Sequence, residues 1–126
     1  MPKRVLSGGE ASAGGLPFSP IVEANGFVFL AGQIGDKPGT RGPVPGGIEP
    51  ETRQMLENVG RLLRSVGLDY GDVVKATVYL ADFDDFAAMN TVYREFFPTE
   101  PPTRATVGVS RLALDCRVEI EVMAAR

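Results

Sequence analysis

The stretch VVKATVYLADFDDFAAMNTVYREFF, residues 73–97, changes its hydrophobic period halfway along. Residues 72–82 alternate between two faces, which predicts a strand. One face carries Val74, Ala76, Val78 and Leu80, and the other carries Val73, Lys75, Thr77 and Tyr79. Residues 84–97 have helical spacing instead, with apolar positions at Phe86, Met89, Tyr93 and Phe97. A strand that runs into an amphipathic helix, closed here by Pro98, indicates a sheet covered by helices.

Upstream of this stretch the sequence predicts a hairpin and another helix. Asn25-Gly26 separates two apolar runs within residues 21–35, and this dipeptide is the strongest short hairpin signal. Both faces of the second run are apolar, so we expect that strand to be buried on both sides. The Gly- and Pro-rich residues 36–49 predict a loop. Apolar residues at helical spacing then predict a helix between Pro50 and Gly67.

Downstream, alternating runs predict strands over 103–110 and 117–124, and residues 3–7 predict a short first strand. Together these elements predict an α+β fold in which a mixed sheet of about six strands carries two helices on one face. The chain of 126 residues fits a single domain, residues 1–126. The other face of the predicted sheet carries Phe27, Phe29, Tyr79, Thr106 and Gly108. We expect further copies of the chain to cover this apolar face.

The composition excludes several kinds of chemistry and of partner. The chain has no histidine and one cysteine, Cys116, which rules out an internal disulfide and a histidine-activated nucleophile and argues against a metal centre. The net charge is −3, and the 13 Lys and Arg residues are scattered, which argues against nucleic acid as a partner. No apolar stretch predicts a membrane span or a secretory signal. We therefore expect a cytoplasmic protein that needs no cofactor.

Three polar residues occupy positions at which the pattern predicts burial: Arg104, Glu119 and Asn90. A buried guanidinium needs an anion, because an unpaired buried charge is costly. That anion is either a ligand or a carboxylate of this chain, with Glu119 and Glu121 as candidates on a neighbouring strand. On spacing alone the structural ion pair is the commoner outcome. For Asn90 a capping or surface amide of the helix is favoured over a site role even more strongly.

Residues 102–120, PTRATVGVSRLALDCRVEI, resemble the signature of the RidA family, the reactive intermediate deaminases. In that signature a Pro, a small residue and an Arg precede alternating small and apolar residues, a short turn and an apolar-Glu-apolar strand. Other segments resemble the family in the same order: AGQIG at 31–35, GGIEPETRQMLENVG at 46–60 and the stretch 73–97. The resemblance covers nearly the whole chain, from about residue 17 to the end.

The resemblance implies the fold of trimeric chorismate mutase, with three copies assembled into a homotrimer and ligand clefts between subunits. It also implies hydrolysis of reactive 2-imino acids, or their enamine tautomers, to 2-keto acids and ammonia, the activity of a 2-iminobutanoate/2-iminopropanoate deaminase. By position, Arg104 is expected to bind the substrate carboxylate and Glu119 to hold the attacking water. The other residues expected to line this cleft are Phe18, Ala31, Gly32, Asn90 and Thr106.

The chain departs from the family pattern at three of these positions. Family members often have Tyr where this chain has Phe18, Ser where it has Ala31, and Cys where it has Thr106. The first two changes each remove a hydroxyl, and a lost hydrogen bond costs about 0.5–1.5 kcal/mol of binding. We expect such changes to alter the substrate range before they abolish activity.

The same departures keep a second function open, a non-catalytic protein that binds small carboxylates in the same cleft. RNA cleavage and general chaperone activity are associated with relatives. An acidic chain without histidine or a basic patch disfavours a nuclease. Chorismate mutase activity would follow from fold analogy alone.

Overall fold

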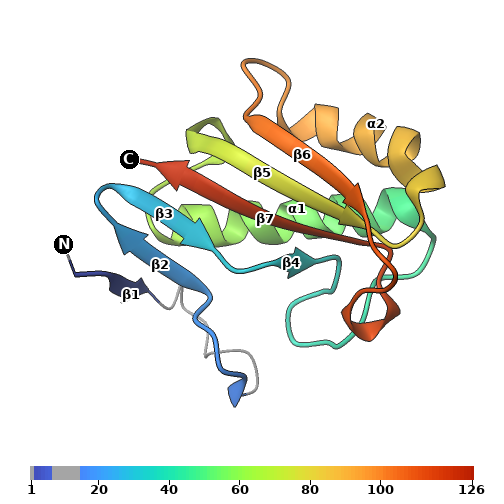
Figure 1. Ribbon diagram of the computed structural model, residues 1–126, viewed down its shortest axis with the longest axis horizontal. Helices are drawn as coiled ribbons and strands as arrows, with labels where there is room; N and C mark the ends of the chain where they lie inside the picture. Colours follow the sequence, from blue (N-terminus) through green and yellow to red (C-terminus); the bar gives the residue numbers. More distant parts are fainter. Residues whose placement is uncertain (1, 7–14) are drawn as a thin grey trace.

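The computed structural model describes residues 2–6 and 15–126, and Figure 1 shows one sheet with both helices behind it. The strands are β1 (Arg4–Leu6), β2 (Ile21–Ala24), β3 (Phe27–Leu30), β4 (Gln33–Ile34), β5 (Val73–Leu80), β6 (Thr103–Gly108) and β7 (Val118–Ala125). The helices are α1 (Ile48–Ser65) and α2 (Phe86–Phe96), with single turns of 3₁₀ helix at Tyr70–Asp72, Phe83–Asp85 and Ala113–Asp115. The first strand predicted over 3–7 is confirmed over Arg4–Leu6; Lys3 lies just before it, and residue 7 lies outside the described residues.

The described strands form one mixed sheet in the order β1-β2-β3-β7-β5-β6, with β4 also paired to β7. Strands β5 and β6 are parallel, with α2 in the crossover between them, and the other pairs are antiparallel. Ala76 of β5 is aligned with Arg104 of β6 on one side and with Val122 of β7 on the other. The predicted α+β class is confirmed, and the described sheet has one strand more than expected.

Helices α1 and α2 cover the same face of the sheet (Figure 1), and the hydrophobic core lies between them and it. Its largest fully buried side chains include Ile21, Met55, Leu56, Leu62, Leu63, Leu80, Met89 and Ile120. Helix α1 begins at Ile48, two residues before the predicted start at Pro50. Gly67 follows its end with φ 82°, the left-handed conformation that glycine adopts readily at this position. Neither helix of the described chain has the length and hydropathy needed to cross a membrane.

The hairpin predicted at Asn25-Gly26 joins β2 to β3. Asn25 has φ 54° and Gly26 has φ 82°, so both turn residues take the left-handed backbone that a type I′ turn requires. In β3, Val28 and Leu30 are buried, whereas Phe27 and Phe29 are 42% and 39% exposed. A single chain therefore covers only one of the two apolar faces of this strand.

An irregularity at the start of β5 changes which residues face the core. The register with β7 shifts between Val73 and Lys75, and such a bulge reverses the alternation locally. Val73 is consequently buried, while Val74, which was predicted to share a face with Ala76 and Val78, is 40% exposed. The predicted alternation of β5 holds from Lys75 onward.

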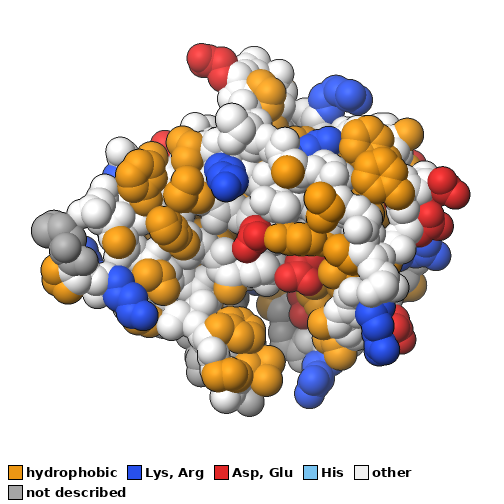
Figure 2. All heavy atoms as spheres, viewed as in Figure 1, with side chains coloured by type: hydrophobic (Ala, Val, Ile, Leu, Met, Phe, Trp, Pro, Cys, Tyr) orange, Lys and Arg blue, Asp and Glu red, His pale blue; other side chains and the backbone are white. Residues whose placement is uncertain are grey.

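The face of the sheet away from the helices is here called the open face. It carries Phe27, Phe29, Lys75, Thr77, Tyr79, Ala105, Val107, Glu119, Glu121 and Met123. Figure 2 shows hydrophobic side chains spread over this face with charged side chains among them. Thr106 and Gly108 were predicted on this face, and that prediction was wrong. They are aligned with the core residues Val78 and Leu80 and lie on the helix side. Pairing with β5, rather than the pattern of β6 itself, sets the orientation.

Candidate functional site

Arg104 lies on the helix side of β6 against the aromatic residues of α2. Its Cζ atom is 4.6 Å from the centre of the Tyr93 ring and 5.7 Å from the centre of the Phe86 ring. A guanidinium is attracted to the face of an aromatic ring. Stacking of this kind holds the plane of the group and leaves N–H donors at its edge available to a carboxylate. We call Arg104 and its neighbours Thr106, Asn90, Phe86 and Tyr93 the arginine half-site.

Arg104 makes no ion pair with a carboxylate in the part of the chain that the structure describes. The two partners considered from the sequence, Glu119 and Glu121, are aligned with Tyr79 and Thr77 and therefore lie on the open face. Arg104 is aligned with Ala76 and lies on the opposite face. A structural pair between Arg104 and either glutamate is therefore excluded within one chain.

Two further polar groups adjoin Arg104 in sequence or in space. Thr106 follows it on the same face of β6, and its Oγ1 is buried without a hydrogen-bond partner among residues 2–6 and 15–126. Asn90 is half-buried and lies one helical turn from both Phe86 and Tyr93, on the same side of α2. Burial raises the pKa of Tyr93, and the nearby Arg104 charge opposes this only in part. The arginine half-site thus combines one cation with neutral hydrogen-bonding groups.

Glu119 belongs to a second group of residues, the glutamate half-site, formed with Gly32 and Ala31. Glu119 is half-buried on β7, between Tyr79 of β5 and Ile34 of β4. Gly32 lies so close that a Cβ at this position would overlap Oε2 of Glu119. Burial raises the pKa of Glu119, and the negative charge of Glu121 raises it further. No hydrogen bond or ion pair of the described chain involves the Glu119 carboxylate.

The residues around the glutamate half-site leave its carboxylate available. Ala31 donates its N–H to the Pro20 carbonyl at 2.9 Å, and its own carbonyl accepts from Gln33 Nε2 at 3.0 Å. Glu121 is already engaged, because the Tyr79 hydroxyl donates to it at 2.5 Å, and this bond raises the pKa of Tyr79. Glu119 is consequently the carboxylate of this region that is available to a water molecule or ligand.

The structure therefore gathers the predicted site residues into two groups rather than one. Arg104, Thr106 and Asn90 lie on the helix side of the sheet, and Glu119 lies on the open face with Gly32 and Ala31 beside it. Phe18 belongs to neither group and is 49% exposed in the segment before β2. Within one chain the sheet separates the two charged residues of the predicted site.

Sequence reasoning missed two residues that bear on these groups. Tyr93 was predicted only as part of the buried stripe of its helix, yet its ring stacks on Arg104. Glu51 is 2% exposed in the first turn of α1. Its position four residues before Met55 and eight before Val59 places it on the buried stripe of that helix, which is a signal the sequence did contain.

The described residues include no cluster of three or more His, Cys, Asp or Glu side chains arranged as metal ligands. Cys116 is buried, and burial raises the pKa of its thiol to about 11, with the charges of Glu51 and Glu119 contributing. A thiol with this pKa is protonated at neutral pH and is a poor nucleophile.

Comparisons with known proteins agree with the fold and show the family of the chain. Residues 10–126 match the sequence model of the family described as Endoribonuclease L-PSP. The chain is 47% identical to a RutC family protein of Pyrococcus horikoshii over 86% of each chain. It is 41% identical to the 2-iminobutanoate/2-iminopropanoate deaminase of Capra hircus, over 97% of this chain and 89% of the relative. The crystal structure of E. coli TdcF with bound serine superimposes with a TM-score of 0.81 at 40% identity, covering 87% of this chain and 88% of TdcF.

The fold and the relatives together define a small α+β protein of a family in which several relatives are named deaminases. The chain belongs to the family described as Endoribonuclease L-PSP, which includes the RidA proteins that its sequence resembles.

Proposed function

We propose that this protein is a cytoplasmic hydrolytic deaminase that converts reactive 2-imino acids, or their enamine tautomers, to 2-keto acids and ammonia. The observation that carries this proposal is the Arg104 guanidinium, stacked on Tyr93 at 4.6 Å and without a carboxylate partner in the described chain. A cation held in this way suits the planar carboxylate that all 2-imino acids share. The deaminase names of relatives about 40% identical support the same reaction.

The proposed chemistry needs only a water molecule and a base. Arg104 binds the substrate carboxylate and thereby places the imine carbon. Ionised Glu119 takes a proton from water as the water oxygen bonds to that carbon and the C=N pair moves to nitrogen, which receives this proton from Glu119 to give a carbinolamine. Glu119 then takes the hydroxyl proton of the carbinolamine and passes it to nitrogen, so that the C–N bond breaks, ammonia leaves and the C=O bond of the keto acid forms with Glu119 ionised again. Because imines hydrolyse in water unaided, orientation of substrate and water supplies most of the required rate enhancement.

The positions of Arg104 and Glu119 imply that a complete site needs two copies of the chain. The two side chains lie on opposite faces of the sheet in one protomer, so they cannot converge on one small molecule there. We infer a homotrimer in which Arg104 of one subunit meets Glu119 of the next. The exposed Phe27, Phe29 and Val107 of the open face support such contacts, because a monomer rarely leaves large apolar side chains together in water.

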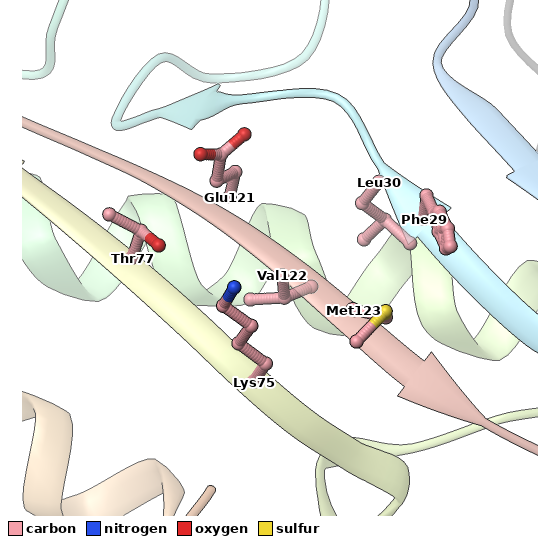
Figure 3. A pocket seen from close by; sticks show the side chains of 7 residues that line it. All are labelled: Phe29, Leu30, Lys75, Thr77, Glu121, Val122 and Met123. Atoms are coloured by element: carbon pink, nitrogen blue, oxygen red, sulfur yellow. The ribbon is translucent and has the colours of Figure 1, made fainter. Parts of the chain in front are cut away.

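The open face also contains a hollow of the kind found at contacts between subunits. A hollow of about 320 Å³ lies there between β3, β7 and β5 (Figure 3). It is lined by Phe29, Leu30, Lys75, Thr77, Glu121, Val122 and Met123. Its apolar floor and its charged rim are what a second copy of the chain would cover in the proposed trimer.

The proposal is tested by the release of ammonia and keto acid from freshly generated 2-iminopropanoate and 2-iminobutanoate. The wild-type protein is expected to accelerate hydrolysis, and Arg104→Ala is expected to lose about 2–4 kcal/mol of transition-state binding, or roughly 30- to 1,000-fold in kcat/KM. Arg94→Ala, an exposed arginine of the same helix that carries Tyr93, is the matched control and should keep full activity. A well-folded wild-type protein that accelerates neither imine contradicts the proposal.

Mixing two impaired variants tests whether the site is shared between subunits. Arg104→Ala and Glu119→Gln are each expected to keep only a small fraction of wild-type activity when assembled alone. When they are unfolded and reassembled together, clefts that combine the intact Arg104 of one variant with the intact Glu119 of the other regain activity, about a quarter of all clefts in a random mixture. Sedimentation should give a mass three times that of the 13.5 kDa chain. No recovery in a correctly assembled mixture would mean that each site lies within one protomer.

A non-catalytic carboxylate-binding protein is the second candidate. It is favoured by Phe18 and Ala31, which lack the hydroxyls common in the family, and by the bound serine of the similar TdcF structure. Thermal stabilisation by serine or a 2-keto acid, without acceleration of any imine, would identify this function.

A further inference from the structure

Glu51 is a buried carboxylate that belongs to neither half-site. It is 2% exposed, and among the described residues only Glu51, Thr52 and Asn58 are polar and buried to this degree. Burial raises the pKa of Glu51, so the fold keeps an acid where its charged form is costly. A carboxylate buried to this degree needs hydrogen-bond donors within the protein.

The contacts of Glu51 lead directly to the glutamate half-site. Its Oε2 accepts a hydrogen bond from the N–H of Arg117 at 2.6 Å and a longer one from the N–H of Val118 at 3.3 Å. These are the two residues immediately before Glu119. Hydrogen bonds from backbone N–H groups to a carboxylate are stronger than those to a neutral acceptor. Glu51 therefore fixes the backbone from which the Glu119 side chain projects.

Glu51 also contacts the other segment of the same half-site. A Cβ at Gly35 would overlap the carbonyl oxygen of Glu51 and come within 2.8 Å of its Cγ. Gly35 ends the segment that contains Gly32 and β4, and β4 pairs with β7 at Ile34 and Glu119. Glu51 thus contacts both segments beside Glu119, through its carboxylate at Arg117 and Val118 and through its backbone and Cγ at Gly35.

The charged groups that face these two acids come from several elements. Arg117 lowers the pKa of Glu51, and Asp85 raises it. Arg117 Nη1 is itself 3.5 Å from Asp85 Oδ2, at the start of α2. The negative charge of Glu121 raises the pKa of Glu119. The charges of Glu51 and Glu119 raise the pKa of the Cys116 thiol, and the charge of Glu119 also raises the pKa of Tyr79. None of these groups replaces Glu51 as the acceptor for the two N–H groups.

We propose that Glu51 is a positioning residue that holds the Glu119 carboxylate against Gly32. The consequence for turnover rests on the proposed function, since it requires that Glu119 activate the attacking water. The Arg104 guanidinium is held instead by the Tyr93 and Phe86 rings of α2, which do not contact the Glu51 carboxylate through any hydrogen bond of the described chain. Loss of Glu51 therefore lowers kcat and leaves KM, which reflects carboxylate binding, nearly unchanged.

The first test needs no substrate. Amide hydrogen exchange and NMR titration of the Glu119 carboxyl group are compared in the wild type, Glu51→Ala, Glu51→Gln and the control Thr52→Val. Thr52 is buried in the same helical turn, and its hydroxyl has no hydrogen-bond partner in the described chain. In Glu51→Ala the amides of Arg117 and Val118 should exchange about tenfold faster or more, and the pKa of Glu119 should fall toward its ordinary value as water reaches it.

Glu51→Gln keeps an acceptor oxygen and should restore slow exchange in part, which also covers the case in which Glu51→Ala does not fold. Thr52→Val should match the wild type in both measurements. If exchange at Arg117 and Val118 and the pKa of Glu119 are unchanged in a folded Glu51 variant, the proposal is wrong.

The second test is kinetic and separates the two proposals. If the wild type hydrolyses imines, Glu51→Ala should lower kcat about tenfold with KM within about twofold, and the acidic limb of its pH profile should move to lower pH. If kcat falls and KM rises by similar factors, and the acidic limb of the pH profile does not move, then Glu51→Ala has loosened the structure generally and the positioning role is wrong. If the wild type hydrolyses no imine, the proposed function fails, and the exchange and titration results alone decide whether Glu51 positions Glu119.

Discussion

The arginine and glutamate half-sites differ in what surrounds them. Arg104 lies against α2, with its guanidinium stacked on one ring and near a second. Glu119 lies on the open face, half-buried, against the backbone of Gly32 and without a hydrogen bond in the described chain. The first group is held by packing within the protomer. The second has one side left uncovered by its own chain.

This difference assigns separate tasks to the two regions. A stacked cation is preorganised and can select a carboxylate at little entropic cost. A half-buried carboxylate with a raised pKa is poised to exchange a proton with water, and its surroundings are completed by whatever packs on the open face. In the proposed trimer, binding strength therefore depends on the helix side of one subunit and proton transfer on the open face of another.

The largest effect is expected from Glu119→Gln, which removes the proposed base but keeps its shape. We expect a loss of about 10²–10⁴ in kcat, with KM little changed. In the wild type, activity should fall with decreasing pH through a midpoint above the ordinary glutamate value of 4.5, because burial raises the pKa of Glu119. The variant should lack this limb. A pH profile of kcat for both proteins is the measurement, and identical profiles would assign the limb to another group.

The same variant gives a stability prediction of known sign. The folded protein binds the Glu119 proton more tightly than the unfolded chain, so this stabilisation is complete at low pH and is lost as the pH rises through the folded pKa. Ionised Glu119 therefore lowers stability at pH 7, and Glu119→Gln should have an equal or higher Tm there. The difference in Tm between Glu119→Gln and the wild type should vanish at a pH below the pKa of an ordinary glutamate. A lower Tm at pH 7 contradicts the raised pKa.

Arg104→Lys tests whether the geometry of the cation matters. Lysine keeps the charge but loses the planar fork and the stack on Tyr93. We expect KM of Arg104→Lys to rise about 10- to 100-fold for imines that carry a carboxylate. The rise in KM should be larger in Arg104→Ala. Steady-state kinetics with both variants decide this. Equal activity of Arg104→Lys and the wild type would show that the positive charge alone, without the planar guanidinium, is enough to bind the substrate carboxylate.

Gly32→Ala probes the glutamate half-site without changing any charge. The new Cβ would overlap Oε2 of Glu119, and the end of a flexible side chain can move away at little cost in stability. We expect kcat to fall about 10- to 100-fold because the base is displaced, with Tm within a few degrees of the wild type. Gly39→Ala is unsuitable as a control because Gly39 has φ 83°, whereas Gly71→Ala meets open space and is suitable. Unchanged kcat in Gly32→Ala would show that Glu119 is not held at Gly32 during the reaction.

The smallest effect is expected at Tyr93. Tyr93→Leu removes the stacked ring, and a partly desolvated cation–π contact contributes about 0.5–2 kcal/mol. We therefore expect KM to rise about 3- to 30-fold, with Tyr93→Phe close to the wild type because the ring is kept. Isothermal titration with a 2-keto acid checks the same effect on binding. A large loss in Tyr93→Phe would instead assign a direct role to the hydroxyl.

Local sequence patterns predicted the elements but not every orientation. Asn25-Gly26 identified the hairpin because only residues that tolerate positive φ fit its turn. The faces of β6 could not be assigned in this way. Arg104 and Thr106 alternate with Ala105 and Val107 along β6. Ala105 and Val107, the more apolar pair, lie on the open face, because pairing with β5 places Arg104 and Thr106 on the side of α2.

Candidate residues were found by type and position, whereas their grouping required the fold. Arg104 and Glu119 stood out because charge in an apolar pattern demands a partner. That they do not pair with each other depends on the register of three strands. The bulge at Val73 and the proposed positioning role of Glu51 also depend on contacts between residues far apart in the chain.

The sequence by itself determined the order of the two helices and of all strands except β4, the absence of histidine chemistry, and the presence of one cation and one acid at sites where burial is costly. These features follow from short-range periodicity and from side-chain type, and both can be read along the chain. Only the tertiary structure decided that the cation and the acid face opposite sides of the sheet. Side-chain direction in a strand is fixed by its neighbours in the sheet, and those neighbours are distant in sequence.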